Sequence, residues 1–241
     1  EARLALAHSH SRRPLCRYAE LDDEAPWLPR SLAEAERAGL SAGWVVADGG
    51  STDGTAQTAR RLGCHLVQGA KGRGAQLAAG AAYARSRIRA EDWLLVLHAD
   101  TRLSPGWSTE VAAFMSANAH RDRAGYFRFT LDDMSHRARR LERAVDWRCR
   151  TFGLPYGDQG LLIRADFYDR LGGFKPWPLF EDVDLVRRIG KHRLWPLTAR
   201  AETSAEKFLA DGYRRRSMKN LVLLARYFLG ARPSDLARSY R

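Results

Sequence analysis

The chain has 241 residues, 45% of them apolar, which is enough for one domain with a sizeable core, and no apolar run approaches the ~20 residues of a membrane-spanning helix. Its 40 Lys and Arg against 28 Asp and Glu give a formal charge of +12, which favours anionic partners: phosphates, nucleic acid or an acidic membrane face. Its three cysteines are widely spaced and indicate cytosolic thiols rather than a disulfide framework or a zinc site.

Strand-like and helix-like segments alternate along the chain. Short apolar or alternating runs predict strands, and longer stretches of helix-forming residues predict helices between them. This alternation predicts an α/β fold with a doubly wound, mostly parallel sheet flanked by helices. The predicted strands are Trp44–Ala47, His65–Gln68, Trp93–His98 and Gly125–Leu131, and the predicted helices are Thr55–Leu62, Gly74–Arg87, Ser104–Asn118 (with Ser104 as N-cap), Ser135–Thr151 and Asp182–Lys191.

The first predicted strand ends in a polar turn. Asp48 lies at the tip of the strand, and Gly49 and Gly50 allow a tight turn and the close approach of a ligand. Ser51, or one of the two residues after it, can cap the helix that follows. Because the same residues also make an ordinary turn, this motif indicates a binding site only together with the others.

A glycine-flanked basic pair, Lys71-Gly72-Arg73-Gly74, precedes the alanine-rich helix. At such a helix start, backbone N–H groups, the helix dipole and fixed positive charge together suit a phosphate. The spacing is neither that of a P-loop nor that of a dinucleotide fingerprint. The pair therefore predicts phosphate contact outside those two motifs.

His98 and Asp100 follow an apolar strand. Residues two apart on a strand point the same way, so both side chains can reach one metal ion or one diphosphate. Ligands of open α/β sheets bind beyond the carboxyl ends of strands, so Asp48 and Asp100 can share one crevice. Carboxylates gathered there suit a divalent cation with a phosphorylated ligand, and the alternative is a polar strand end capped by its loop.

A third acidic cluster, Glu181-Asp182-Val183-Asp184, opens the last predicted helix. Acidic residues in a first turn are favourable partners of the helix dipole, which is one explanation for them. A carboxylate beside a phosphate and metal pocket can also act as a general base toward an incoming hydroxyl.

In this order and spacing, the motifs resemble family 2 glycosyltransferases, the inverting class with the Rossmann-like GT-A fold. VVADGGSTDGT resembles the nucleotide motif of that family, LVLHADT its Asp-x-Asp metal motif, GLPYGDQGLLIR its acceptor-side segment and LGGF…FEDVDLVRR its Glu-Asp catalytic motif. The resemblance runs from about Leu21 to about Thr203. The His-Ala-Asp form and the Arg-rich tail are similar to a small bacterial subgroup of arsenosugar-biosynthesis-like or carotenoid-glycosyltransferase-like type.

The resemblance implies a hexosyltransferase-like enzyme that moves a sugar from a nucleotide sugar, expected to be a UDP-sugar, to a small-molecule or lipid-linked acceptor with inversion. Asp182 would be the base, and Glu181 would position it or the acceptor. Asp100 with His98 would hold Mg²⁺ or Mn²⁺. The implied nucleotide site is Asp48 (uracil or ribose), Arg73 (diphosphate), Gly49, Ser51, Lys71 and Gln76, and the implied acceptor or sugar side is Tyr156, Gly157, Asp158 and Gln159.

Two departures from the family pattern stand out. His98 replaces the usual first Asp of the metal motif, and its nitrogen suits Mn²⁺ better than Mg²⁺. Residues Arg12–Glu20 stand where the family has an apolar central strand, and Arg and Glu are poor occupants of a strand buried on both faces. We therefore expect residues 1–20 to lack that regular strand.

The C-terminal region is basic and amphipathic. From Lys207 to Arg241 it has nine Lys and Arg and two Asp, and apolar residues follow basic ones along Tyr213–Leu229. Such a helix suits an anionic membrane surface, or else packs on the domain with its basic side in water. We expect an atypical segment at 1–20, a GT-A domain at 21–205 and basic helices at 206–241, in a cytoplasmic protein peripheral to the inner membrane face.

Three other functions fit parts of the sequence. A nucleic-acid-binding module fits the charge and the 10% aromatic content, but it leaves the ordered acidic motifs unexplained and shows no nucleic-acid signature, so we expect no nucleic-acid partner. A nucleotidyltransferase on a similar fold, and a relic that binds nucleotide without catalysis, are the other two alternatives.

Overall fold

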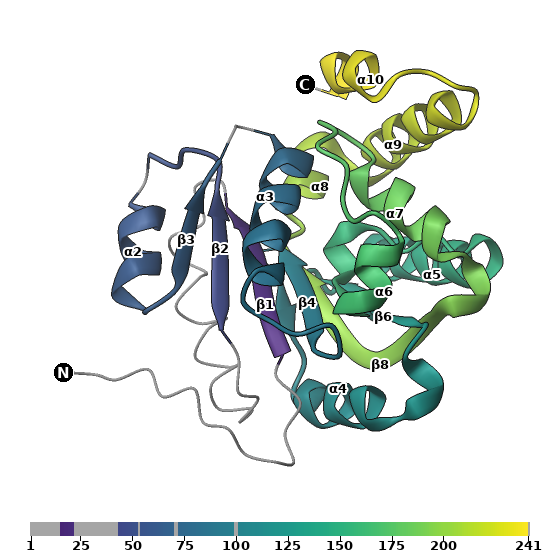
Figure 1. Cartoon of the computed structure of the whole chain (residues 1–241). Helices are drawn as coiled ribbons and strands as arrows, with labels where there is room; N and C mark the ends of the chain where they lie inside the picture. The colour runs from purple at the N-terminus through teal and green to yellow at the C-terminus, as the bar shows by residue number, and fades with distance from the viewer. Residues whose placement is uncertain (1–14, 22–42, 53, 70–71, 99–100, 241) are drawn as a thin grey trace.

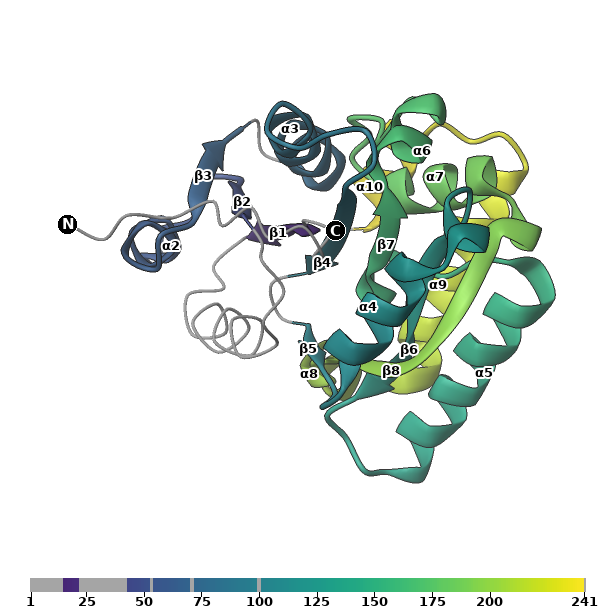
Figure 2. The same ribbon diagram turned by 60° about the horizontal axis from the view of Figure 1, so that its bottom comes forward.

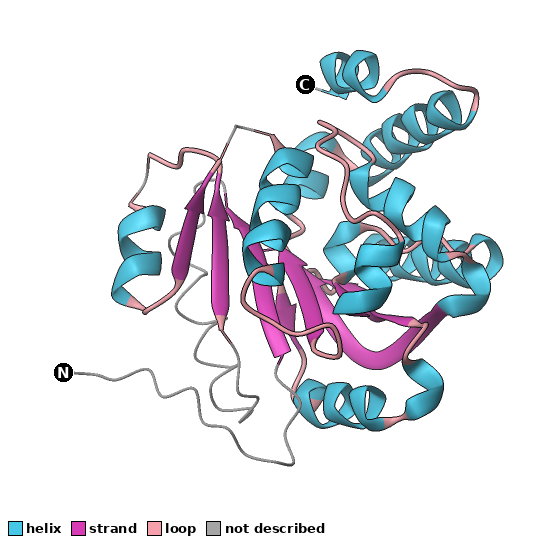
Figure 3. Cartoon of the chain, in the orientation of Figure 1, coloured by secondary structure: helices cyan, strands magenta, loops and turns pink. Residues whose placement is uncertain are grey.

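The computed structural model describes residues 15–21, 43–52, 54–69, 72–98 and 101–240, and for residues 15–21 it gives the course of the backbone. These residues form one sheet in the order β3-β2-β1-β4-β7-β6-β8-β5, with helices on both faces (Figures 1 and 3). The strands are β1 (Leu15–Leu21), β2 (Trp44–Asp48), β3 (His65–Gln68), β4 (Trp93–His98), β5 (Arg102–Leu103), β6 (Ala124–Leu131), β7 (Leu161–Arg164) and β8 (Leu194–Thr203).

Four neighbouring strands form the parallel half of the sheet. β3, β2, β1 and β4 pair in parallel, whereas β7 is antiparallel to both β4 and β6. Farther along, β8 is parallel to β6 and antiparallel to β5. The predicted α/β fold with a mostly parallel sheet is confirmed, and the carboxyl ends of β2 and β4 lie at the same edge.

The described helices are α2 (Thr55–Arg61), α3 (Arg73–Arg85), α4 (Trp107–Ser116), α5 (His136–Phe152), α6 (Ala165–Arg170), α7 (Glu181–Ile189), α8 (Glu206–Asp211), α9 (Tyr213–Phe228) and α10 (Pro233–Tyr240). Leu94 and Val96 of β4 join the core under α3, α6 and α7, whereas Leu95 joins the core under α4. α2 packs through Ala59 against Val46, on the face opposite α3 (Figure 2). Within these described helices, none is long and apolar enough to cross a membrane.

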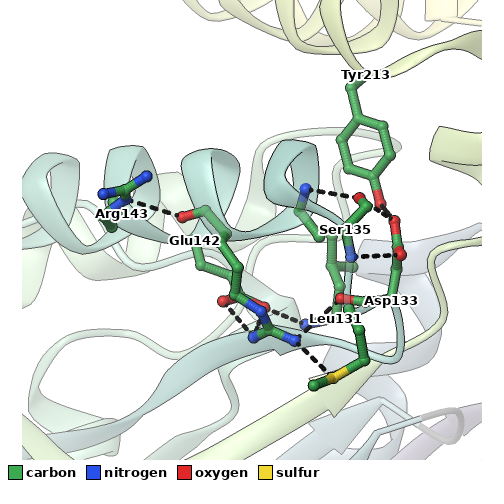
Figure 4. Close-up of polar contacts among 9 residues, drawn as sticks. Leu131, Asp133, Ser135, Glu142, Arg143 and Tyr213 are labelled. Atoms are coloured by element: carbon green, nitrogen blue, oxygen red, sulfur yellow. Dashed lines mark hydrogen bonds and ion pairs between the residues drawn. The ribbon is translucent and has the colours of Figure 1, made fainter.

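Helix α9 is anchored to the start of α5 (Figure 4). The Tyr213 hydroxyl donates to Asp133 Oδ2 at 2.5 Å, and Ser135 donates to the same carboxylate from its hydroxyl at 2.7 Å and its N–H at 2.8 Å. The bond from Tyr213, and then those from Ser135, hold the pKa of the Asp133 carboxyl below its usual range. Ser135 also caps α5 by accepting from the Ala138 N–H, so one turn fixes the starts of both helices.

Strand β1 corrects the expectation for the N-terminal segment. Leu15–Leu21 is a regular strand between β2 and β4 and parallel to both, whereas residues 1–14 lie outside the described residues. Without β1, the facing edges of β2 and β4 would each present unpaired N–H and C=O groups inside the sheet. Glu20 pairs with His98, the last residue of β4, so this residue lies near the carboxyl end of β1 rather than at its middle.

The N-caps of two helices differ from their predictions, whereas α2 begins at Thr55 as predicted. α4 begins at Trp107 with Gly106 as N-cap, because Ser104 pairs with β8 instead: its hydroxyl accepts from the Arg200 N–H at 2.9 Å. α2 has Gly54 as N-cap, because Ser51 bonds to Asp48. Strands β7 and β8 and helix α6 are not predicted by the sequence pattern, which becomes irregular after about residue 150.

Gly74 lets α3 pack directly on the loop before α7. Its N–H donates to Trp177 O at 3.1 Å, and a Cβ at this position would collide with that oxygen and lie 2.7 Å from Trp177 N and 2.8 Å from Lys175 O. All three are backbone atoms, which cannot rotate away. We expect Gly74→Ala to lower the free energy of unfolding by about 2 kcal/mol through overpacking, as measured by urea titration.

The matched control is Gly43→Ala, because a Cβ at Gly43 would have no atom within 4 Å. If Gly74→Ala unfolds at the same urea concentration as Gly43→Ala, the close contact between α3 and the 175–177 loop is wrong.

Candidate active site

The predicted motifs meet at the carboxyl edge of the parallel strands. Asp48 and His98 are the last residues of β2 and β4, which belong to the same parallel set. Two helices begin at this edge: α3 with Arg73 and α7 with Glu181. Two polar groups result, one around Asp48 and one around Arg73.

The group around Asp48 is compact and buried. Asp48 is 1% exposed, and its Oδ1 accepts from the Ser51 N–H at 3.0 Å and from the Ser51 hydroxyl at 2.6 Å. Gln76 Nε2 lies 3.5 Å from Ala47 O, and a Cβ on Gly49 would fall 2.6 Å from that nitrogen. A residue larger than Gly49 would therefore have to displace the Gln76 amide. The structure brings these four predicted residues together, whereas Lys71 lies outside the described residues.

Arg73 is the centre of the second group. Its Nε lies 2.9 Å from Glu181 Oε1, and its Nη2 lies 2.6 Å from His98 Nε2 and 3.6 Å from Asp182 Oδ2. The Glu181 side chain is 1% exposed, whereas that of Arg73 is 32% exposed. One guanidinium thus joins the end of β4 to the first turn of α7 and still faces solvent. A planar fork with several donors suits this arrangement better than an ammonium would.

His98 is held in its neutral form. Burial of the ring, and then the positive charges of Arg73 and Lys207, lower its pKa well below its ordinary value. Since the arginine can only donate, His98 Nε2 accepts the hydrogen bond from Arg73. The neutral ring is the form that ligates metals, but in this state its Nε2 lone pair is engaged by Arg73.

The Asp182 carboxylate is fixed by two backbone donors. The Gly157 N–H donates to Oδ2 at 2.7 Å, and the Val183 N–H donates to Oδ1 at 2.7 Å. A Cβ on Gly157 would fall 2.9 Å from His98 Nε2 and 3.2 Å from Asp182 Oδ2, so a larger residue would have to displace these side chains. Gly157 and Asp182, 25 residues apart in the chain, are therefore in direct contact.

The turn at residues 156–159 is held from inside the core by Gln159. This buried side chain donates to Phe127 O at 3.0 Å, and its Oε1 accepts from the Tyr156 N–H at 3.2 Å. Arg148 lies over the Tyr156 ring, 3.5 Å from its centroid, and burial raises the pKa of Tyr156 to about 12. Gln159 supports the turn, Asp158 is half-buried beside it, and Tyr156 borders the cavity described next.

A cavity of about 20 Å³ lies at the junction of these elements. Its lining includes His98, Tyr156, Gly157 and Asp182 together with apolar side chains such as Leu77. The space holds about one water molecule. It places the carboxylate and the imidazole beside apolar walls, where interactions between charges are stronger than in bulk water.

Only one of the two predicted metal ligands, His98, lies within the described residues. Among the described residues, no group of three or more His, Cys, Asp or Glu is placed to hold a metal ion. Asp100, the other predicted ligand, lies outside them. The neutral imidazole of His98 can ligate a divalent cation, and it lies at the same sheet edge as the Asp48 carboxylate. The described residues therefore have the ligand chemistry that such a cation needs.

Sequence reasoning missed three contributors. Lys207, at the start of α8, is close enough to His98 to lower its pKa. Arg148 supports Tyr156 from α5. Phe180, immediately before Glu181, has a positive φ of 64°. Lys207 and Arg148 lie in basic stretches that the sequence shows, but their contacts, like the conformation of Phe180, depend on how distant helices pack.

Comparison with known proteins identifies a family. The profile of Glycosyl transferase family 2 matches residues 23–169, which is more than half of the chain. No curated protein matches the chain in a sequence search.

Solved structures share the fold. A mannosyltransferase from Pyrobaculum calidifontis, in complex with GDP-Man and Mn²⁺, is 17% identical with a TM-score of 0.62, over 95% of this chain and 69% of its own. GalNAc-T7 with UDP, GalNAc and Mn²⁺ is 13% identical with a TM-score of 0.59, over 81% and 44%. S. aureus TarS 1-349 with UDP-GlcNAc is 13% identical with a TM-score of 0.57, over 79% and 58%. At these identities the likeness concerns the fold.

Proposed function

Because the chain belongs to glycosyl transferase family 2 and is therefore a glycosyltransferase, we propose that it moves a sugar from a UDP-sugar to an acceptor hydroxyl with inversion at the anomeric carbon. The observation that carries this proposal is the position of Asp182. Its carboxylate is fixed by two N–H groups, borders a small cavity and lies 3.6 Å from a solvent-facing arginine. A base and a phosphate-binding cation at one strand edge are what such a transfer needs.

The donor would lie along the strand edge from Asp48 to Arg73. In this proposal Asp48, backed by Ser51, contacts the uracil or ribose, and Gly49 and Gln76 line the same pocket. The exposed part of Arg73 faces the diphosphate, with Lys71 from the preceding turn. Proteins of similar fold that bind GDP-Man, UDP or UDP-GlcNAc support a nucleoside diphosphate as the ligand class.

Asp182 would act as the general base. Its carboxylate takes the proton from the acceptor hydroxyl as that oxygen forms a bond to the anomeric carbon. The bond from that carbon to the diphosphate oxygen breaks on the opposite side, and the electron pair leaves with UDP. Glu181 positions Arg73, and Tyr156, Gly157 and Asp158 border the sugar or acceptor, with Gln159 holding their turn.

A divalent cation would be held by Asp100 with His98. When bound, it offsets the negative charge that develops on the departing diphosphate. His98 supplies nitrogen rather than oxygen, which favours Mn²⁺ over Mg²⁺. To ligate through Nε2, His98 must give up its bond to Arg73, which would free that guanidinium for the phosphates.

The experiment is a screen of nucleotide sugars for hydrolysis and for transfer, with Mn²⁺, with Mg²⁺ and with a chelator. We expect release of UDP from a UDP-sugar, fastest with Mn²⁺. Binding of UDP without release from any nucleotide sugar would favour the catalytically impaired relic. Pyrophosphate formation from a sugar phosphate and a nucleoside triphosphate would favour the nucleotidyltransferase.

For the acceptor side, we propose that residues 206–241 form a basic region that holds the domain (21–205) at an anionic membrane face of the cytoplasm, beside a lipid-linked acceptor. Arg215, Met218, Val222 and Arg226 follow one stripe of α9 and line a groove of about 390 Å³ between α9 and α10. The Met218 side chain is 60% exposed and that of Val222 is 51% exposed. Cations beside exposed apolar side chains fit an anionic lipid surface.

We expect the protein to sediment with anionic vesicles at low salt and to be released at high salt, because each basic residue near such a surface contributes ~1 kcal/mol, which salt screens. Arg215→Glu with Arg226→Glu should weaken sedimentation about tenfold or more. Arg60→Glu with Arg61→Glu is the matched control, since both arginines are exposed on α2, at the opposite end of the molecule (Figure 1). Protein that stays in the supernatant at low salt would favour a soluble small-molecule acceptor.

A further inference from the structure

Phe180, directly before the Glu181-Asp182 pair, has an unusual backbone conformation. It is the one non-glycine residue with positive φ among the residues that the structure describes, at φ 64° and ψ 20°. A bulky residue is rare in this left-handed region, because its Cβ crowds the backbone. Phe180 is the N-cap of α7, so the two residues that follow it are Glu181 and Asp182. Such strain persists only where the surrounding structure holds it in place.

What holds Phe180 comes from the C-terminal helix. Its ring lies against that of Tyr227 in α9, with centroids 5.0 Å apart and planes at 36°. Both rings pack on a cluster of buried residues: Leu154 beside the turn at residues 156–159, Val183 in α7 and Leu224 in α9. The side chain of Phe180 is thus anchored on a helix that begins more than 30 residues later in the chain.

The conformation of Phe180 sets where the Asp182 carboxylate lies. Phe180 O accepts from the Asp184 N–H at 2.9 Å, the first helical bond of α7. One turn of backbone then places Asp182 so that its Oδ1 accepts from the Val183 N–H and its Oδ2 from the Gly157 N–H. If φ of Phe180 left the positive region, α7 would start in another direction and these two bonds could not both form.

We propose that Tyr227 is a positioning residue: its ring holds Phe180 in the left-handed conformation and thereby fixes the Asp182 carboxylate at the cavity. The catalytic consequence rests on the proposed role of Asp182 as the base, whereas the structural claim does not. Tyr227 touches neither reacting atoms nor nucleotide in this proposal. In this proposal its effect on Asp182 passes through the ring contact with Phe180, so ring size at position 227 matters and the hydroxyl does not.

Amide hydrogen exchange followed by NMR tests the structural claim without any substrate. Tyr227→Ala should speed exchange of the Val183 and Asp184 amides tenfold or more relative to the unmodified chain, while Tyr227→Phe changes it less than twofold. Exchange at Leu162 and Ile163 in β7 should not change, which excludes global unfolding. Phe152→Ala is the matched control, because it removes an exposed aromatic ring that packs on Trp147 of the same helix, 5.2 Å away.

A double-mutant cycle shows whether the effect passes through Phe180. Phe180→Gly removes the ring and accepts a positive φ without strain. In that background Tyr227→Ala should change exchange of the Asp184 amide less than twofold. An equal tenfold effect in both backgrounds, or no effect of Tyr227→Ala in the unmodified chain, would overturn the proposal.

Kinetics then separate this proposal from the proposed function. With any nucleotide sugar that is turned over, Tyr227→Ala should lower kcat about tenfold. The KM for that donor and the Kd for UDP should stay within twofold. Tyr227→Phe should have the kcat of the unmodified chain. If no nucleotide sugar is turned over by the unmodified chain, the proposed function fails, and the exchange data still decide the role of Tyr227. Unchanged kcat together with faster exchange would overturn the positioning role.

Discussion

Asp182→Asn is expected to lower turnover by roughly 100-fold or more while leaving the affinity for UDP within about twofold, the usual scale for loss of a general base. The substitution keeps the size of the side chain and removes its basicity. Asp182 accepts from both the Gly157 N–H and the Val183 N–H. An amide oxygen can replace only one of those acceptors, so the remaining N–H faces an NH₂ group and the side chain also loses its fixed orientation. Steady-state kinetics and UDP calorimetry measure the two effects.

The matched control is Asp184→Asn, two residues farther along the same turn. Asp184 accepts from Lys175 at 2.9 Å and from Arg188 Nε at 2.8 Å, away from the small cavity, so we expect lost stability with kcat retained within a few fold. Near-normal turnover in Asp182→Asn would assign the base elsewhere, with Glu181 the first residue to test.

Arg73→Ala is expected to weaken UDP binding by roughly 10- to 100-fold, because hydrogen bonds to a charged group contribute about 1.5–3 kcal/mol. The affinity for uridine, which has no phosphate, should change much less. The difference between the two ligands isolates the diphosphate contact from any general damage. Arg73→Ala also removes the ion pair at 2.9 Å between Arg73 and the buried Glu181 carboxylate, so the unfolding temperature should fall.

Arg73→Lys separates charge from geometry. The lysine keeps the positive charge but cannot span His98, Glu181 and Asp182 with one planar group. We expect it to recover part of the affinity for UDP and little of the turnover. Equal losses for UDP and uridine in Arg73→Ala would mean that Arg73 organises the fold of the site and does not contact the phosphates.

The sequence predicts the parallel half of the fold because its signals are local. Apolar runs such as Trp93–His98 mark strands, and a polar residue after a run marks a strand's carboxyl end. Parallel pairing then places Asp48 and His98 at one edge without further information. The same reliance on side-chain pattern fails for β1, where backbone pairing on both sides outweighs the polar residues of the segment.

The contacts within the site depend on packing that no local pattern encodes. The sequence predicts that Arg73 faces a diphosphate, which stays a prediction. In the structure Arg73 joins Glu181 to His98, because the first turns of α3 and α7 meet. That meeting requires Gly74 against the 175–177 backbone. Gln159 supports the turn from inside the core, a role that its place in a polar motif does not suggest.

The most direct test of inverting transfer with Asp182 as base follows the anomeric proton by ¹H NMR while the chain is incubated with a UDP-α-sugar in the absence of an acceptor. Water then takes the place of the acceptor hydroxyl at the cavity beside Asp182. In-line attack with Asp182 as base predicts that the β-anomer of the free sugar appears first, before mutarotation, and that Asp182→Asn produces it at least about 100-fold more slowly. First appearance of the α-anomer, or no release of sugar from any nucleotide sugar with Mn²⁺ present, would contradict an inverting glycosyltransferase built on these residues.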